Sequence, residues 1–256
     1  MNKKMIAIIA KEIDEEIIQY YNSLKDFKND IFVITPDFSN EIVQKYPKIN
    51  FTKDEAILDK KNYPKIKDTD RPGWYYQQLL KYQVVLTFHE KYNYDFVYVI
   101  DGDSYIKEDL LMEENIYYTP KLIESEYQNF IDKTNLNLKD SRNFITNQMC
   151  YRASYLINML KEISDNKDWI DVLLDIIIKN NDCWFSEYQI YAIYVKYRFN
   201  VLEKPIKVFR RLDLINVTVT RALSKYSVLA KEVYHSRTFL HVLRAKIYFS
   251  LGINLG

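Results

Sequence analysis

The chain is poor in glycine and cysteine. Its 256 residues include only four glycines, six prolines and two cysteines. No run is rich in glycine and serine, which excludes an obvious flexible linker or low-complexity segment. The two cysteines, Cys150 and Cys183, have no metal-ligand spacing. We interpret them as small buried side chains of a reduced intracellular protein.

Long apolar runs are also missing. No stretch approaches the roughly 20 apolar residues that a membrane span needs. The run from Met5 to Ala10 is shorter than the core of a signal peptide and continues into charged residues. We therefore expect a cytoplasmic protein. Because 48% of the residues are apolar or aromatic, the chain can bury one sizeable core.

Two apolar runs near the N-terminus predict buried strands, at residues 5–10 and 31–35, with an amphipathic helix between them. Two such strand and helix units imply a parallel, Rossmann-type α/β sheet flanked by helices. Neither strand is followed by a glycine-rich nucleotide fingerprint. Nicotinamide enzymes, flavin enzymes and phosphate-loop ATPases are therefore disfavoured.

The stretch from Phe96 to Asp103 contains the main candidate site. Five apolar or aromatic residues predict a strand buried on both faces, and Asp101, Gly102 and Asp103 follow it directly. In open α/β sheets ligands bind at the carboxyl ends of strands, so the two acids are candidates for holding a divalent cation and a diphosphate. The alternative is an ordinary Asp-Gly turn.

A helix is predicted from Arg71 to about Lys91. Gln77, Gln78 and Lys81 lie in its first turns, where amides and a cation could reach a sugar hydroxyl or a phosphate. The alternative interpretation is a solvated helix face.

Residues 144–151 predict a further strand, which the polar pair Asn147 and Gln148 interrupts. Buried polar side chains need partners, either protein groups or the hydroxyls of a ligand. Helices are predicted at 153–163 and 169–179.

Ser186 is the expected N-cap of another helix, which places Glu187 near the positive end of the helix dipole and favours an ionised carboxylate. This could be an ordinary helix start. It could also be a carboxylate on a rigid element beside the aromatic residues Trp184 and Tyr188, which suits sugar binding or proton abstraction from a hydroxyl.

The C-terminal segment is basic. Residues 204–256 carry ten Lys or Arg against two acids, a net charge of +8, while the whole chain is +1 and the remainder therefore −7. An anionic membrane, a diphosphate or nucleic acid could bind such a surface. An amphipathic basic helix is predicted from Thr238 to Leu251, which either packs on the core or lies on an anionic leaflet. His235 precedes it and could bind a cation.

These stretches together resemble a bacterial family of predicted glycosyltransferases with the GT-A fold, usually associated with surface polysaccharides such as capsule or lipopolysaccharide. The similarity rests on Pro72-Gly73-Trp74 with Gln77-Gln78-Leu79-Leu80-Lys81, on Asp101-Gly102-Asp103, and on Ser186-Glu187-Tyr188 with Tyr191. It spans residues 1–200, and 201–256 would form a basic extension that packs on this domain or on a membrane. Gly102 stands where the family often has serine.

The resemblance implies transfer of a sugar from a nucleotide-diphosphate donor to a glycan or lipid-linked glycan acceptor, with Mn²⁺ or Mg²⁺ as cofactor and no role for nucleic acid. Asp103 would bind the cation directly, and Asp101 the ribose or a water on the cation. Glu187 would be the general base of an inverting enzyme or would position the acceptor of a retaining one. The candidate site residues are Glu187 for catalysis; Asp101, Asp103 and His235 for metal; Ala10, Lys11, Arg71, Gln77, Gln78, Lys81, Asp101 and Gly102 for the donor; and Asn147, Gln148, Trp184 and Tyr188 for the acceptor.

Two other functions remain open from the sequence. An apolar strand ending in two spaced aspartates also occurs in haloacid-dehalogenase-type phosphatases, where the first acid is the nucleophile. In those enzymes the motif normally lies on the first strand, and here at least two strands precede it. A non-catalytic binding protein with the same fold is the other alternative. If the basic helix binds lipid, the protein would be peripheral at the inner face of the plasma membrane.

Overall fold

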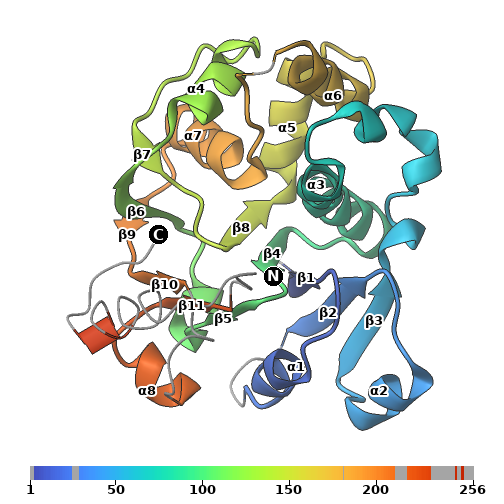
Figure 1. Cartoon of the computed structure of the whole chain (residues 1–256), viewed down its shortest axis with the longest axis vertical. Coiled ribbons are helices and arrows are strands. Elements are labelled where there is room, and N and C mark those ends of the chain that lie inside the picture. The colour runs from blue at the N-terminus through green and yellow to red at the C-terminus, as the bar shows by residue number, and fades with distance from the viewer. Residues whose placement is uncertain are drawn as a thin grey trace.

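The computed structural model describes residues 3–24, 29–180, 182–210, 218–231, 246 and 249–250. A five-stranded sheet with the order β3-β2-β1-β4-β8 forms its centre (Figure 1). The strands are β1 (Lys4–Ile9), β2 (Asp30–Thr35), β3 (Ile49–Lys53), β4 (Phe96–Asp101) and β8 (Gln148–Arg152). The first four are mutually parallel and β8 is antiparallel to β4. The fold therefore belongs to the expected α/β class.

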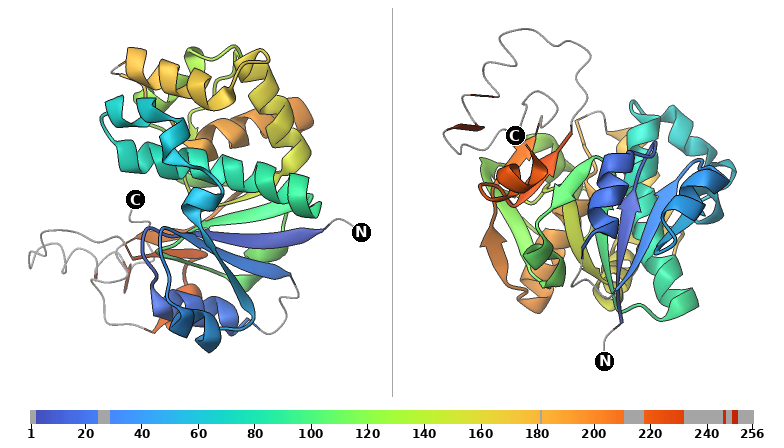
Figure 2. Two further views of the ribbon diagram at one scale, coloured as in Figure 1. Left: turned by 90° about the vertical axis from the view of Figure 1, so that its right-hand side faces the viewer. Right: turned by 90° about the horizontal axis from the view of Figure 1, so that it is seen from below.

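Helices cover both faces of this sheet (Figure 2). Along β1, Ile6 and Ile8 pack into the core beneath the first helix, whereas Ala7 and Ile9 pack into the larger core on the opposite face. This alternation follows from the two-residue period of a strand. The smaller layer holds α1 (Glu15–Asn22) and α2 (Asn40–Lys45), and the larger one α3 (Pro72–Tyr92), α5 (Ala153–Ser164), α6 (Trp169–Lys179) and α7 (Glu187–Phe199).

Most of the predicted helices are confirmed, and their capping residues explain where they begin. Asp14 accepts hydrogen bonds from the backbone N–H groups of Glu16 and Ile17, so α1 begins at Glu15. Pro72 occupies the first turn of α3, where a missing N–H costs nothing. Ser186 caps α7, as the sequence predicted.

Several elements were not predicted from the sequence. They include α2, β3 and the short 3-10 helices Asp54–Ala56, Lys60–Asn62, Pro64–Asp68 and Glu108–Met112. They also include α4 (Ser125–Asp132) and α8 (Val219–Leu223). Two small sheets, of order β10-β11-β5 and β7-β6-β9, complete the described chain. Their strands are β5 (Ser104–Ile106), β6 (Ile116–Leu122), β7 (Arg142–Asn143), β9 (Glu203–Pro205), β10 (Val208–Arg210) and β11 (Val228–Ala230).

The described residues beyond 200 pack on the rest of the chain. Strand β9 pairs with β6, and β11 pairs with β5, which directly follows the acidic turn. The domain boundary at 200 stays a prediction. The predicted helix at 238–251 lies almost entirely outside the described residues. Among the helices of the described ranges, none combines the length and the apolar character that crossing a membrane requires.

The prediction of a strand at 144–151 is wrong for the first half of this range. Only β8, from Gln148, pairs with β4. Asn147 has a positive φ of 61°, which ends the extended chain. The N–H of Phe144 donates to Gln189 Oε1 at 2.9 Å instead of to a neighbouring strand. The polar residues that interrupted the apolar pattern therefore mark the true start of the strand.

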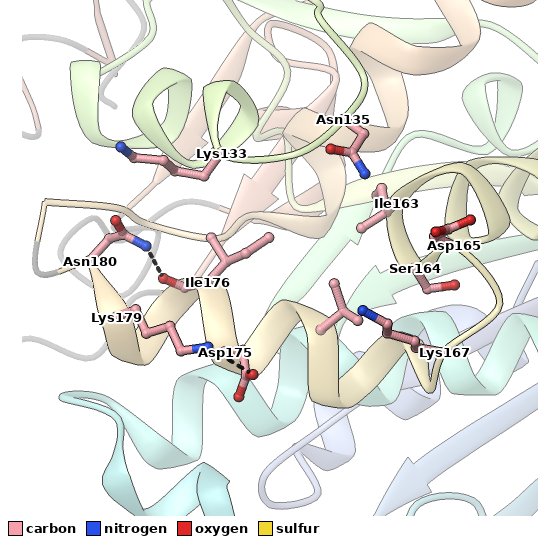
Figure 3. A pocket seen from close by; sticks show the side chains of 11 residues that line it. Lys133, Asn135, Ile163, Ser164, Asp165, Lys167, Asp175, Ile176, Lys179 and Asn180 are labelled. Carbon is pink, nitrogen blue, oxygen red and sulfur yellow. Dashed lines mark hydrogen bonds and ion pairs between the residues drawn. The ribbon is translucent and has the colours of Figure 1, made fainter.

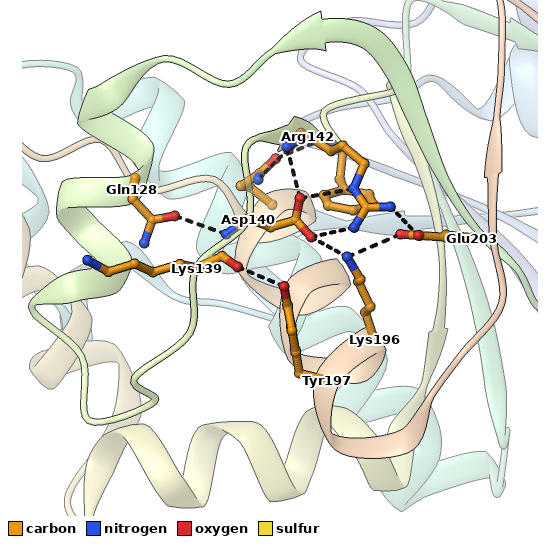
Figure 4. A network of polar contacts seen from close by, with 9 residues as sticks. Gln128, Lys139, Asp140, Arg142, Lys196, Tyr197 and Glu203 are labelled. Atoms are coloured by element: carbon orange, nitrogen blue, oxygen red, sulfur yellow. Dashed lines mark hydrogen bonds and ion pairs between the residues drawn. The ribbon is translucent and has the colours of Figure 1, made fainter.

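A charged network holds α7 at its C-terminal end (Figure 4). Asp140 accepts two hydrogen bonds from the guanidinium of Arg142, at 3.0 Å from Nε and 2.8 Å from Nη2, and it also pairs with Lys196 of α7. Glu203 of β9 contacts both cations. Two carboxylates balance two cations, so the network fixes α7 against β7 and β9 without leaving a net charge.

Candidate functional site

The acidic turn lies where β4 ends, beside the end of β1. Ile9 of β1 is in register with Asp101, and the N–H of Gly102 donates to Ile9 O at 2.8 Å. A Cβ placed on Gly102 would lie 2.5 Å from the Cβ of Ala10, closer than atoms can approach. Glycine is therefore required for this close contact between the turn and β1. Serine, which is frequent at this position in the family that the sequence resembles, would not fit here.

Lys81 joins the two candidate acids that come from different elements. Its Nζ lies 2.6 Å from Asp101 Oδ1 at the end of β4 and 2.6 Å from Glu187 Oε1 at the start of α7. The Lys81 side chain is 5% exposed and that of Glu187 is 0% exposed, whereas Asp101 is 26% exposed. Asp101 is thus the member of this trio that faces outward.

Three further side chains fix the trio. Tyr188 donates its hydroxyl to Asp101 Oδ1 at 2.8 Å, and its ring lies 4.3 Å from Lys81 Nζ. Tyr82 donates to the backbone oxygen of Glu187 at 2.8 Å. Gln78 faces Glu187, and the amide orientation that satisfies both groups has its NH₂ donating to both carboxylate oxygens, at 3.1 Å to Oε1. The acids are therefore held in one arrangement by helices α3 and α7.

The charges do not balance within this buried trio, because one ammonium serves two carboxylates. Burial raises the pKa of Glu187 to about 7, an effect that Lys81 opposes and Asp101 reinforces. Burial acts to lower the pKa of Lys81, but the two carboxylates outweigh it and the pKa is raised. The prediction that the helix dipole would favour an ionised Glu187 is therefore incomplete, since loss of solvent dominates at this position.

Asn147 and Gln148 lie directly beside the acidic turn. The N–H of Asp101 donates to Asn147 O at 3.0 Å. Asn147 and Gln148 are 8% and 2% exposed. Among the described residues, neither Asn147 Oδ1 nor Gln148 Nε2 has a hydrogen-bond partner. An unsatisfied buried polar atom costs free energy, so the pair retains capacity to bind a ligand's hydroxyls or an ordered water.

The second acid, Asp103, connects the turn to the C-terminal part of the chain. Its Oδ1 accepts the Ser104 hydroxyl at 2.9 Å, and its backbone oxygen accepts the N–H of Lys231 at 2.8 Å. The Lys231 ammonium pairs with Asp14 and Glu16 at 2.9 and 2.6 Å. His235, the third predicted metal residue, lies outside the described residues.

The remaining predicted site residues are not all brought to the acidic turn. Ala10 is buried directly against Gly102, Lys11 is exposed and Gln77 is half-buried. Arg71 lies instead beside Trp184, with its guanidinium carbon 4.6 Å from the indole centre. The structure therefore groups Arg71 with a residue predicted for the acceptor.

Some residues of the site were missed by sequence reasoning. Tyr82 and Lys231 carried no signal, because their partners lie 105 and 217 residues away in the sequence.

The donor set fits a hard divalent cation. Asp101 and Asp103 supply carboxylate oxygens, which Mg²⁺ and Mn²⁺ prefer, and Mg²⁺ often uses one or two carboxylates together with substrate phosphates. Within the described ranges no group of three or more His, Cys, Asp or Glu is placed to hold a metal. The two acids therefore suit a cation shared with a bound diphosphate better than a closed protein site.

A hollow of about 450 Å³ lies elsewhere, between the C-terminal ends of α4 and α5 and one side of α6 (Figure 3). Lys133, Lys167 and Lys179 line it together with Asp165 and Asp175. Lys179 already pairs with Asp175 at 3.1 Å. None of the predicted site residues lines this hollow, so it is separate from the acidic turn.

No family model matches the chain. No curated protein matches it either. Among solved structures, it is similar to the galactosyltransferase LgtC in complex with donor and acceptor sugar analogs, with 11% identity, a TM-score of 0.46 and coverage of 97% of this chain and 95% of that one. An active-site mutant of LgtC matches with 12% identity, a TM-score of 0.44 and coverage of 98% and 97%.

Proposed function

We propose that this chain is a metal-dependent glycosyltransferase of GT-A type. It would move a sugar from a nucleotide-diphosphate sugar to a glycan or lipid-linked glycan acceptor in bacterial surface polysaccharide synthesis. The observation that carries the proposal is that Asp101 ends β4 beside Lys81 and the buried polar pair Asn147 and Gln148, with Asp103 two residues further on in the same turn. Ligands of open α/β sheets bind at this edge.

In this proposal, the residues of the chain have the following roles. Asp103 and Asp101 would hold Mn²⁺ or Mg²⁺ with the donor diphosphate, and Gly102 and Ala10 would form the wall beside it. When bound, the cation supplies positive charge to the departing diphosphate. Lys81 would keep the Asp101 carboxylate in place. Asn147 and Gln148 would offer their unsatisfied oxygen and amide to sugar hydroxyls.

Glu187 has two conceivable roles in this scheme. A pKa of about 7 suits a general base that works near neutral pH. Its side chain is nevertheless fully buried behind Lys81 and Gln78, so an acceptor hydroxyl reaches it only if one of these moves. The geometry therefore favours Glu187 as the residue that positions Lys81, and its role as base stays a prediction.

The phosphatase alternative has little support. It would need a further acidic pair near the first aspartate, and the described residues offer no third metal-binding group there. Moreover, Asp101 Oδ1 forms an ion pair with Lys81 and accepts a hydrogen bond from the Tyr188 hydroxyl. Both interactions would hinder this oxygen from attacking a phosphate ester as a nucleophile.

The test is to incubate the protein with a panel of nucleotide sugars and Mn²⁺ and to measure release of UDP, GDP or CMP. Release from one donor, abolished by a chelator and restored by Mn²⁺, is the expected result. Hydrolysis of simple phosphate esters by the same preparation would favour the phosphatase. Binding of a nucleotide sugar without any turnover would indicate the non-catalytic protein.

A further inference from the structure

Two tryptophans and an arginine gather where α3 and α7 begin. Arg71 precedes α3, and its guanidinium carbon lies 4.6 Å from the ring centre of Trp184 and 5.8 Å from that of Trp74. Tyr127 of α4 packs edge-on against Trp184, with ring centres 5.7 Å apart. Both indoles and the Tyr127 ring are only partly buried. We call these four residues the tryptophan platform.

The platform is connected to the acidic turn through α3 and α7. Trp74 is seven residues before Lys81 on the same face of α3, about 10 Å along the helix axis. Lys81 contacts Asp101, the last residue of β4. Trp184 is three residues before Glu187. The backbone N–H of Trp184 donates to Glu126 O at 3.0 Å, which fixes the position of this residue. The platform therefore extends the site beyond the edge of the sheet, in the direction of the N-terminus of α3.

The surroundings of Tyr127 support the same placement. Burial and Glu124 raise the pKa of its phenol to about 12, Arg71 opposes this, and Glu187 adds to it. Tyr127 is thus within electrostatic reach of both the platform arginine and the buried carboxylate of the trio.

The platform is better suited to a neutral ring than to a diphosphate. Arg71 Nε lies 3.5 Å from Asp70, so its positive charge is already partly balanced. Partly exposed Trp and Tyr side chains offer large, rigid contact surfaces that cost little conformational entropy when a ligand binds.

We propose that the tryptophan platform binds a sugar ring of the carbohydrate acceptor, with Trp184 as its main aromatic surface and Arg71, whose guanidinium lies over the Trp184 ring, as its polar group. This inference rests on the proposed function. It moves Arg71 from the donor to the acceptor and adds Trp74 and Tyr127 to the site.

Binding can be measured without any donor. Intrinsic tryptophan fluorescence is followed while cellobiose, lactose, maltose or N,N′-diacetylchitobiose is added up to ~50 mM, since weak stacking alone gives millimolar Kd values. We expect at least one of these disaccharides to change the fluorescence saturably. If none does, or if Trp184→Ala binds the responding sugar as tightly as the wild type in an equilibrium measurement, the inference is overturned.

Kinetics with the donor found in the nucleotide-sugar panel give a second readout. In Trp184→Ala we expect the half-saturating sugar concentration to rise about tenfold or more, kcat to fall much less, and Trp184→Phe to recover part of the loss. Tyr92→Ala, an exposed aromatic at the other end of α3, is the matched control and should behave as the wild type. A parallel fall in kcat and thermal stability would mean that Trp184 is structural.

The two proposals fail in different ways. Absence of turnover with every donor refutes the glycosyltransferase, whereas disaccharide binding is measured without a donor. Turnover with an unchanged half-saturating sugar concentration in Trp184→Ala refutes only the acceptor platform.

Discussion

Replacing Glu187 by glutamine removes a fully buried titrating group and nearly preserves its shape. The folded pKa of about 7 is raised from the ordinary 4.5. Below about pH 4.5 the carboxyl is protonated in both states and imposes no penalty. Between pH 4.5 and about 7 the carboxyl of the unfolded chain is ionised, while that of the folded chain keeps its proton. The free energy of unfolding therefore falls as the pH rises, until the pKa of the folded state is passed.

The size of this effect follows from the shift. A difference of about 2.5 pKa units at roughly 1.4 kcal/mol each gives about 3 kcal/mol that the wild type loses between about pH 4.5 and 8. The side chain is 0% exposed, so solvent screening does not reduce it. In Glu187→Gln the part of the pH dependence of stability that comes from this carboxyl should vanish. Lys81 keeps its other partner, Asp101, at 2.6 Å. At pH 8 the variant should therefore be at least as stable as the wild type.

Urea unfolding at several pH values measures this directly. Asp109→Asn removes a carboxylate that is 62% exposed and paired with Lys107 at 3.0 Å, and it serves as the control for loss of one surface charge. If the wild type and Glu187→Gln show the same change in unfolding free energy between pH 5 and 8, within about 0.5 kcal/mol, the assignment of a raised pKa to Glu187 is wrong. The same variant should lose ~10²–10⁴-fold in turnover with donor binding kept if Glu187 is the base.

Three further predictions concern the acidic turn and the basic segment. Asp103→Ala should abolish turnover and metal-dependent nucleotide binding while the exposed control Asp109→Ala retains both; metal-dependent affinity retained in full by Asp103→Ala would contradict the metal assignment. Gly102→Ala should cost about 1–3 kcal/mol of unfolding free energy through overpacking against Ala10. Gly73→Ala, where an added Cβ meets nothing within 4 Å, is its control, and equal stability of the two would refute the close contact. The protein should co-sediment with anionic but not neutral vesicles and be released by ~0.5 M salt, because each Lys or Arg near anionic lipid contributes ~1 kcal/mol. If the protein stays in the supernatant at low salt, the membrane prediction is wrong, and the basic surface would instead bind the diphosphate of the substrate.

The local pattern of the sequence determined the α/β class and much of the larger helical layer. The run from Phe96 to Ile100 is apolar or aromatic on every residue, as expected for a strand covered on both faces. The Ser186 cap accepts a hydrogen bond from an N–H group three residues away, so it can be predicted without knowing the fold. The position of Asp101 and Asp103 at the end of a parallel strand follows from the same local signals.

Only the tertiary structure decided how those residues meet. Lys81 and Glu187 are 106 residues apart, and Asp101 and Tyr188 are 87 apart, so no local pattern shows that one ammonium serves two acids. The need for glycine at position 102 arises from the end of β1, more than 90 residues earlier. The expectation for Glu187 rested on the helix dipole, a local effect, and burial by α3 outweighed it. Such contacts depend on how the chain is packed, and packing is the information that a local sequence pattern does not contain.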